Sequence, residues 1–210
     1  MKTPHPYQQE AIELGTRRNL LIADQTGLGK SLVAAEIGKR CQQRIAGHNL
    51  IIAPLNTLPQ WQDVLAEQDP STPVIRLSKE FSPLALQRIG PKSWCIAHYE
   101  LVASIHEQLR RVEWTTAIVD EAHRIKTRVT KAKRQKIEKR ASEGKKTRTP
   151  QTEAVKEATF RAQRKLALTG TPWDKNPADL WSILNWLYPQ HYTSYWRFHE
   201  AHTKEEFNYL

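Results

Sequence analysis

The sequence predicts an α/β fold with a mainly parallel sheet that is covered by helices on both faces. Three observations predict it: short apolar runs recur along the chain, helix-compatible stretches separate them, and polar residues stand at the ends of several runs. Strands that are buried on both faces read as nearly continuous apolar runs, and alternation with helices indicates a parallel sheet. The 210 residues suffice for one well-buried domain, whereas two would be cramped.

Six apolar runs are expected to form the strands. They occupy residues 19–24, 49–53, 74–77, 94–98, 116–120 and 166–169. In an open parallel sheet, ligands bind beyond the carboxyl ends of the strands. The residues at such ends here are Asp24, Pro54, His98, Asp120 and Thr169. We therefore expect several strand-end groups to converge on one rim of the sheet.

Helices are expected between the strands, at residues 31–40, 59–68 and 99–110. A further helix is predicted over residues 179–188, because apolar residues recur there at spacings of three and four, which is typical of a helix with one buried face. These apolar residues are Leu180, Ile183, Leu184 and Leu187. Trp181 and Trp186 on the same segment are interpreted as core residues.

The positive charge of the chain is concentrated in one region. The net charge is +10, yet residues 124–165 hold 16 lysines and arginines against 4 acidic residues, which leaves about −2 for the remainder. Such a segment suggests a polyanionic partner, and we hypothesise that residues 124–160 contact nucleic-acid phosphates. The alternative is a solvated insert that orders nothing.

Composition excludes several classes of protein. No stretch approaches the roughly 18 consecutive apolar residues of a membrane span, and the N-terminus carries no apolar signal core. The two cysteines, Cys41 and Cys95, form no metal-binding or disulfide pattern. We expect no membrane contact, and a cytoplasmic or, in a eukaryote, nuclear location rather than secretion.

A glycine-rich segment after the first strand predicts a phosphate-binding loop. It reads Asp24-Gln25-Thr26-Gly27-Leu28-Gly29-Lys30-Ser31. Its glycines let backbone N–H groups point at phosphate oxygens, and the following helix N-terminus favours negative charge. Lys30 can reach the β- and γ-phosphates, and the Ser31 hydroxyl can bind Mg²⁺. The general pattern has glycine where Asp24 stands, and the Gly-Leu-Gly-Lys-Ser run alone would also suit a simple turn.

Two carboxylates at the end of the fifth strand complete a predicted nucleotide-hydrolysis site. Asp120 is placed to hold Mg²⁺ through water, and Glu121 can polarise the attacking water as a general base. An acidic pair alone could instead mark the start of a helix. The phosphate loop upstream favours the catalytic interpretation.

Together the motifs resemble the Swi/Snf-like branch of superfamily 2 helicases. In that branch an acidic residue stands at the position of Asp24. The segments that carry the resemblance are 24–31 (motif I), 120–126 (motif II), 168–172 (motif III), the continuation 176–189, 6–8 (the glutamine motif), 50–54 with Trp61 downstream (motif Ia) and 97–101 (motif Ib). They occur in family order and span nearly the whole chain.

The resemblance implies a RecA-like lobe of the P-loop NTPase class over residues 1–189, with ATP and Mg²⁺ as cofactors and duplex DNA as the partner. Lys30, Asp120 and Glu121 would be catalytic, and Ser31 and Asp120 would bind the metal. The implied ATP contacts are Gln8, Asp24, Gln25, Thr26, Gly27, Leu28, Gly29, Lys30, Ser31 and His123. The implied nucleic-acid residues are Pro54, Asn56, Thr57, His98 and Tyr99, with Thr169, Gly170 and Thr171 coupling nucleotide state to nucleic-acid contact. His98 could instead be a histidine satisfied inside the fold.

The family places ATP between two RecA-like lobes, and this chain resembles only the first. Residues 190–210 are expected to begin the connection to a second lobe, and residues of about 129–156 to form a basic insert. An arginine finger contributes about 10³–10⁵-fold in rate, so the chain alone is expected to bind ATP weakly and hydrolyse it poorly. The alternative is a stand-alone module that binds nucleic acid or a protein partner with little ATPase activity.

Overall fold

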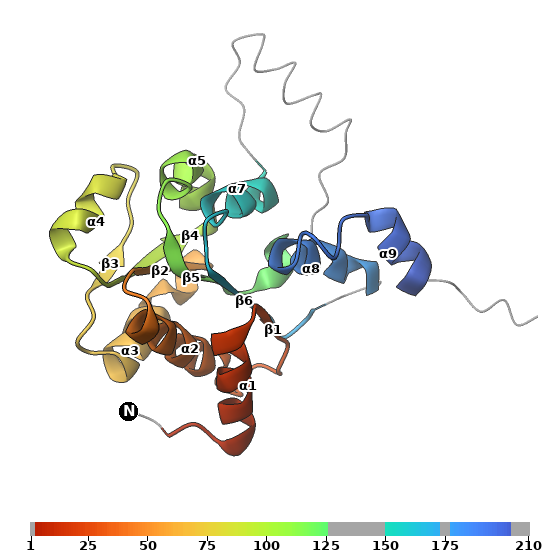
Figure 1. The fold of residues 1–210 in the computed structure, drawn as a ribbon, viewed down its shortest axis with the longest axis horizontal. Coiled ribbons are helices and arrows are strands. Elements are labelled where there is room, and N and C mark those ends of the chain that lie inside the picture. The colour runs from red at the N-terminus through yellow and green to blue at the C-terminus, as the bar shows by residue number, and fades with distance from the viewer. Residues whose placement is uncertain (1–2, 126–149, 173–176, 203–210) are drawn as a thin grey trace, which may run out of the picture.

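The computed structural model describes residues 3–125, 150–172 and 177–202 and has one six-stranded sheet at its centre (Figure 1). The strand order is β1-β6-β5-β2-β4-β3, and every pairing is parallel. The strands are β1 (Leu20–Ile22), β2 (His48–Ala53), β3 (Val74–Arg76), β4 (Ser93–His98), β5 (Trp114–Val119) and β6 (Arg164–Leu168). All six strands predicted from the apolar runs, and the parallel sheet, are confirmed.

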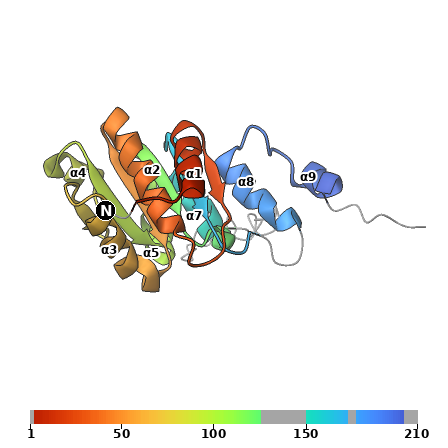
Figure 2. The ribbon, with the colours of Figure 1, turned by 90° about the horizontal axis from the view of Figure 1, so that it is seen from below.

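Helices cover both faces of the sheet. One face carries α1 (Pro6–Arg17), α2 (Lys30–Arg44) and α3 (Leu58–Gln68), which lie side by side in Figure 2. The other carries α4 (Pro83–Ile89), α5 (Tyr99–Leu109), α7 (Gln151–Ala158) and α8 (Trp181–Leu187). Short 3₁₀ helices η1 (Leu55–Thr57), η2 (Ala122–Ile125) and η3 (Pro177–Leu180) lie in the connections, and α9 (Tyr195–His202) lies outermost.

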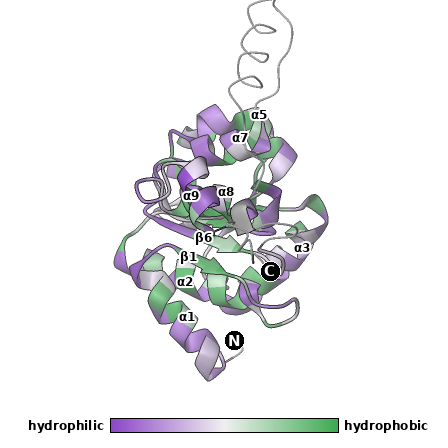
Figure 3. Cartoon of the chain, turned by 90° about the vertical axis from the view of Figure 1, so that its right-hand side faces the viewer, coloured by the Kyte–Doolittle hydropathy of each residue, from purple (hydrophilic) through white to green (hydrophobic). Residues whose placement is uncertain are grey.

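The alternation of side chains along β2 shows why the sheet needs both helical layers. Leu50 and Ile52 belong to the apolar cluster under α5 and α7, whereas Ile51 and Ala53 belong to the cluster under α1, α2 and α3. Successive strand residues point to opposite faces, so a continuous apolar run buries both faces. Hydrophobic residues also gather on β1 and the neighbouring part of α2 (Figure 3).

The end of the predicted basic insert requires a correction. From Pro150 onwards the chain is described, and residues 151–158 form α7, a helix that packs against α5. Ala154, Val155 and Ala158 are all 0% exposed, so this part belongs to the core and is not a solvated loop. Residues 126–149, which carry most of the predicted insert, lie outside the described residues.

Four predicted helices are confirmed in position, and four described helices were not predicted. The confirmed helices are α2, α3, α5 and α8; the others are α1, α4, α7 and α9. Trp186 is a core residue, as predicted, at 2% exposed. Trp181 is half-buried, with its ring edge against Tyr195 at a centroid distance of 5.7 Å.

Neither cysteine takes part in a disulfide bond. Cys41 and Cys95 are both buried and unpaired, and burial raises the pKa of the Cys95 thiol to about 12. Among the described residues, every helix is too short or too polar to cross a membrane.

Candidate active site

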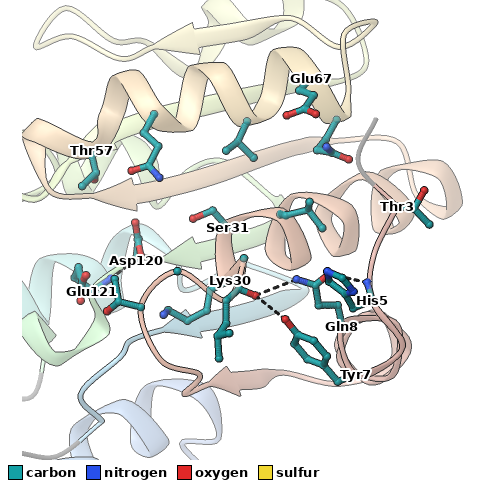
Figure 4. A pocket seen from close by; sticks show the side chains of 18 residues that line it. Thr3, His5, Tyr7, Gln8, Lys30, Ser31, Thr57, Glu67, Asp120 and Glu121 are labelled. Atoms are coloured by element: carbon teal, nitrogen blue, oxygen red, sulfur yellow. Dashed lines mark hydrogen bonds between the residues drawn. The ribbon is translucent and has the colours of Figure 1, made fainter.

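The predicted catalytic residues line one cavity of about 570 Å³ at the carboxyl ends of the central strands. Figure 4 shows Asp120 and Glu121 at one end of this cavity, Gln8 and Tyr7 at the other, and Lys30 and Ser31 between them. The walls come from α1, the loop after β1, the start of α2, α3 and the residues after β5. Segments far apart in the sequence therefore meet at the expected rim.

The loop before α2 has the backbone geometry of a phosphate cradle. Gly27 and Gly29 have φ angles of +90° and +78°, which residues with a side chain rarely adopt. A Cβ added at Gly29 would lie 2.6 Å from Gln8 Nε2, whereas one added at Gly27 would meet no heavy atom within 4 Å. A glycine at position 29 thus suits the left-handed conformation and leaves room for the Gln8 amide beside the loop.

Lys30 is folded back onto its own loop. Its ammonium group donates hydrogen bonds to the backbone carbonyls of Asp24, at 2.8 Å, and Gln25, at 3.0 Å. These carbonyls hold the positive charge at the mouth of the loop. The side chains of Asp24 and Gln25, and that of His123, are not among the cavity-lining groups, in contrast to the other predicted ATP contacts.

Asp120 is held from three directions. The Trp61 indole N–H donates to Asp120 Oδ2 at 2.9 Å, and the backbone N–H of Glu121 donates to Oδ1 at 3.0 Å. Burial raises the pKa of Asp120, and these two hydrogen bonds oppose the rise because they favour the carboxylate. The Tyr99 hydroxyl donates to the Asp120 carbonyl oxygen at 2.5 Å. The carboxylate is thereby fixed facing the phosphate loop.

Glu121 has a strained backbone. Its φ angle of +49° is the one positive value among the described non-glycine residues. A non-glycine residue in this region costs on the order of 1–3 kcal/mol and persists only where its surroundings hold it. His123 Nδ1 lies 3.2 Å from Glu121 Oε2 and 3.4 Å from Thr169 Oγ1, so the histidine joins the carboxylate to the turn after β6.

That turn also touches the phosphate loop. Thr169 Oγ1 accepts a hydrogen bond from the backbone N–H of Thr171 at 3.1 Å. A Cβ added at Gly170 would lie 3.1 Å from Thr26 Oγ1. The turn at residues 169–171 therefore contacts both halves of the candidate active site. Its role in coupling nucleotide state to nucleic-acid contact stays a prediction.

The far end of the cavity contains residues that the sequence interpretation missed. Gln8 donates to the Leu28 carbonyl at 3.0 Å and accepts from the His5 N–H at 2.8 Å. Tyr7 also donates to that carbonyl, at 3.3 Å, and its ring stacks on His5 at a centroid distance of 5.9 Å. The unpredicted lining residues are Thr3, His5, Tyr7, Leu32, Gln60, Val64, Glu67 and Gln68. An aromatic pair beside Gln8 was the available signal for His5 and Tyr7.

The residues present fit a magnesium nucleotide. The cavity falls in the usual range of about 300–1,000 Å³ for small-molecule sites. An ammonium, a hydroxyl and a carboxylate are the donor set that phosphate and Mg²⁺ require. The open space over Gly27 leaves room for phosphate beside the loop N–H groups. Gln8 Nε2 keeps one N–H beyond its bond to Leu28, which could contact a base.

The residues predicted to contact nucleic acid differ in how far their side chains are exposed to solvent. Asn56 is exposed on η1, and Pro54 is half-buried where that helix begins. Thr57 lines the same cavity as Lys30 and Asp120. Tyr99 requires a correction, because its side chain is 0% exposed and cannot reach a nucleic acid.

His98 has partners within the fold. Its Nδ1 lies 3.0 Å from Glu100 Oε2 and 3.3 Å from the Leu101 N–H, at the start of α5. These contacts fit the interpretation of a satisfied histidine. The side chain nevertheless remains 27% exposed, so a nucleic-acid role is still open to it.

Comparison with known proteins points to one family. The family model for the SNF2-related domain matches residues 7–143 and 141–208. Helicase SWR1 of Cryptococcus neoformans var. neoformans (strain B-3501A) is 30% identical over 199 residues, which cover 89% of this chain and 14% of that protein. The human SWI/SNF-related matrix-associated actin-dependent regulator of chromatin subfamily A member 1 is 30% identical over 183 residues, covering 84% of this chain and 16% of that protein.

Solved structures share the fold. The Sulfolobus solfataricus SWI2/SNF2 ATPase core in complex with dsDNA has a TM-score of 0.72 at 24% identity, covering 95% of this chain and 38% of that chain. The structure of the Sulfolobus solfataricus SWI2/SNF2 ATPase core domain has a TM-score of 0.73 at 25% identity, with the same coverage.

The chain spans only a small part of its relatives. It covers about one sixth or less of the length of helicase SWR1 and of the human chromatin regulator named above.

Proposed function

This chain belongs to the SNF2-related family, and from that premise we propose that it is the ATP-binding lobe of a DNA-dependent ATPase that translocates on duplex DNA. Completed by a second lobe, it would hydrolyse ATP to ADP and phosphate. The observation that carries the proposal is that Lys30 and Ser31 share one cavity with Asp120 and Glu121. Phosphoryl transfer needs a cation, a metal-binding hydroxyl and carboxylate, and a group that orients water.

Each of these residues has a distinct role in the proposal. Ser31 and Asp120 would hold Mg²⁺, which supplies charge neutralisation at the phosphates when it is bound. Lys30 would exchange the two loop carbonyls for phosphate oxygens. Glu121 would accept a proton from the attacking water. The strained backbone at Glu121 directs two successive carboxylates into the same cavity.

Duplex DNA is the proposed polymer partner. A similar solved structure is described as a complex with dsDNA, which supports the proposal. In the proposal, the groups at the ends of β2 and β4, namely Pro54, Asn56, Thr57 and His98, would face the duplex. Such contacts go mainly to phosphates and sugars, so binding would depend on salt and carry little sequence information. We place the assembled protein in the nucleus or cytoplasm, since the human relative is named as a chromatin regulator.

The second lobe would come from the same or another polypeptide, and would supply the arginine finger. A stand-alone binding module is the alternative. The presence of Lys30, Asp120 and Glu121 in one cavity argues against it, because packing alone requires none of the three.

Nucleotide affinity tests the proposal. We expect Lys30→Ala to weaken binding of a non-hydrolysable ATP analogue with Mg²⁺ by roughly 10- to 100-fold, because a charge-assisted hydrogen bond contributes about 1.5–3 kcal/mol. Titration calorimetry on the 210-residue chain would measure it. Arg40→Ala is the matched control, since Arg40 lies on the same helix but pairs with Glu36. Equal affinities for the wild type and Lys30→Ala would favour the binding module.

A further inference from the structure

Two buried aromatic side chains donate hydrogen bonds to Asp120 from two different helices. The Trp61 indole of α3 lies 2.9 Å from Asp120 Oδ2, and the Tyr99 hydroxyl of α5 lies 2.5 Å from the Asp120 carbonyl oxygen. Trp61 is 1% exposed and Tyr99 is 0% exposed. Water therefore cannot replace Asp120 as the acceptor, and a buried donor left unpaired is costly. The position of each helix is thus tied to the position of Asp120.

Both helices start at the surface proposed to face DNA. Helix α3 begins at Leu58, directly after η1 with Asn56 and Thr57, and Trp61 lies within its first turn. Helix α5 begins at Tyr99 itself, directly after His98. A helix moves as a stiff unit over a single turn, so a displacement at either start is passed on to the aromatic donor.

The Tyr99 hydroxyl also holds the strained turn. Besides the Asp120 carbonyl, it lies 3.4 Å from the Glu121 carbonyl oxygen. The residue between these carbonyls is Glu121, with its φ of +49°. Trp61 thus positions the Asp120 carboxylate, and Tyr99 positions the backbone that directs Asp120 and Glu121 into the cavity.

We propose that Trp61 and Tyr99 are positioning residues that transmit DNA contact at η1 and His98 to the metal-holding Asp120. DNA bound at the starts of α3 and α5 would orient the Asp120 carboxylate to hold Mg²⁺. Because coupling between two sites is reciprocal, bound Mg²⁺ nucleotide would in turn position the starts of the two helices to bind DNA. This inference rests on the proposed function. It is a separate route from the turn at Thr169, which reaches Glu121 through His123.

The test measures coupling on the 210-residue chain without turnover. The affinity for a fluorescent ADP analogue with Mg²⁺ is measured at low salt with and without a short DNA duplex. We expect DNA to tighten binding by about fivefold or more in the wild type. The ratio of the affinity with DNA to the affinity without DNA is the coupling ratio. Trp61→Phe removes the indole N–H and part of the ring, and Tyr99→Phe removes only the hydroxyl. Both should bring the coupling ratio close to 1 and raise the Mg²⁺ concentration needed for half-maximal nucleotide binding. Binding measured in EDTA should stay unchanged.

Two control variants match the chemistry elsewhere in the fold. Trp94 is also a fully buried indole that donates to a carboxylate, Asp69 Oδ2, at 2.9 Å. Tyr188 also donates its hydroxyl to a backbone carbonyl, that of Asn19. Trp94→Phe and Tyr188→Phe should lose comparable stability in urea while keeping the wild-type ratio. If one test variant does not fold, the other decides, because each lies on its own helix.

The outcomes separate this inference from the proposed function. A wild-type ratio that survives in Trp61→Phe and Tyr99→Phe overturns the inference alone. A coupling ratio of 1 in the wild type also overturns the inference, provided that the wild type binds DNA and that its nucleotide binding depends on Lys30. Loss of the ratio in the control variants as well overturns it, because the effect would then be one of general stability. Nucleotide binding that is equal in wild type and Lys30→Ala overturns both proposals.

Discussion

Glu121 shows how much of the site depends on single backbone angles. Its left-handed φ is held by bonds around it: its own N–H to Asp120, its carboxylate to His123, and the Tyr99 hydroxyl beside its carbonyl. The strain is offset by the surrounding contacts and brings two adjacent carboxylates to one cavity. Glu121 and Asp120 could be predicted from the sequence because acidic residues at a strand end follow a pattern. The strain could not, since no residue type signals it there.

Gly29 provides a test at this scale. We expect Gly29→Ala to lower the free energy of unfolding by about 1–2 kcal/mol, the cost of a left-handed residue with a Cβ, and also to weaken Mg²⁺ nucleotide binding. The added Cβ would lie 2.6 Å from Gln8 Nε2 and would displace this side chain from its hydrogen bond to the Leu28 carbonyl. Urea denaturation and analogue binding would measure the two effects.

Gly90 is the matched control for that substitution. Its φ is +119°, and an added Cβ would meet no heavy atom within 4 Å. Gly90→Ala should therefore destabilise the fold without changing nucleotide affinity. A Gly29→Ala variant that binds nucleotide as tightly as Gly90→Ala would contradict the role given to the loop.

Helix α7 illustrates both the reach and the limit of prediction from sequence at the scale of elements. The six strands were predictable because buried parallel strands are continuous apolar runs. Helix α7 was not, because it buries Ala154, Val155 and Ala158 among charged neighbours, and small residues leave a weak apolar signal. Helix α1 was missed for a similar reason, and with it His5 and Tyr7 at its start. Tyr99 was assigned to DNA because the resemblance implied it, and nothing in the sequence gave the direction of its side chain, which is buried.

The packing of α7 changes how the basic segment should be tested. Deleting residues 129–156 would remove buried core residues, so we expect a large fall in Tm. Deleting 129–149 spares α7 and tests whether the segment binds nucleic-acid phosphates, as hypothesised. If it does, the slope of log affinity against log salt should become shallower by about 0.9 for each phosphate that the shortened protein no longer neutralises. DNA titrations at several salt concentrations measure it, and an unchanged slope would contradict the hypothesis.

At the scale of the whole molecule, this chain provides the groups that would bind Mg²⁺ and orient the attacking water, and all of them lie on one side of the proposed nucleotide. The described residues that line the cavity include one cation beside the phosphate loop, Lys30. We expect the isolated chain to hydrolyse ATP very slowly, and a second lobe from a relative to raise the rate by about 10³–10⁵-fold, as arginine fingers do. Phosphate release measured with DNA present, with and without that lobe, would check it. Robust DNA-stimulated turnover by the 210-residue chain alone would contradict the expectation.

The strand order has a consequence for how the chain folds as it is made. Strand β1, which leads into the phosphate loop, lies at the edge of the sheet, and its pairing is with β6 near the other end of the chain. A ribosome adds about 5–20 residues per second, so β1 would wait on the order of ten seconds for its neighbour. The strands β2 to β5 can pair with one another in the meantime. A nascent chain would therefore gain the ability to bind nucleotide late, only after β6 has emerged.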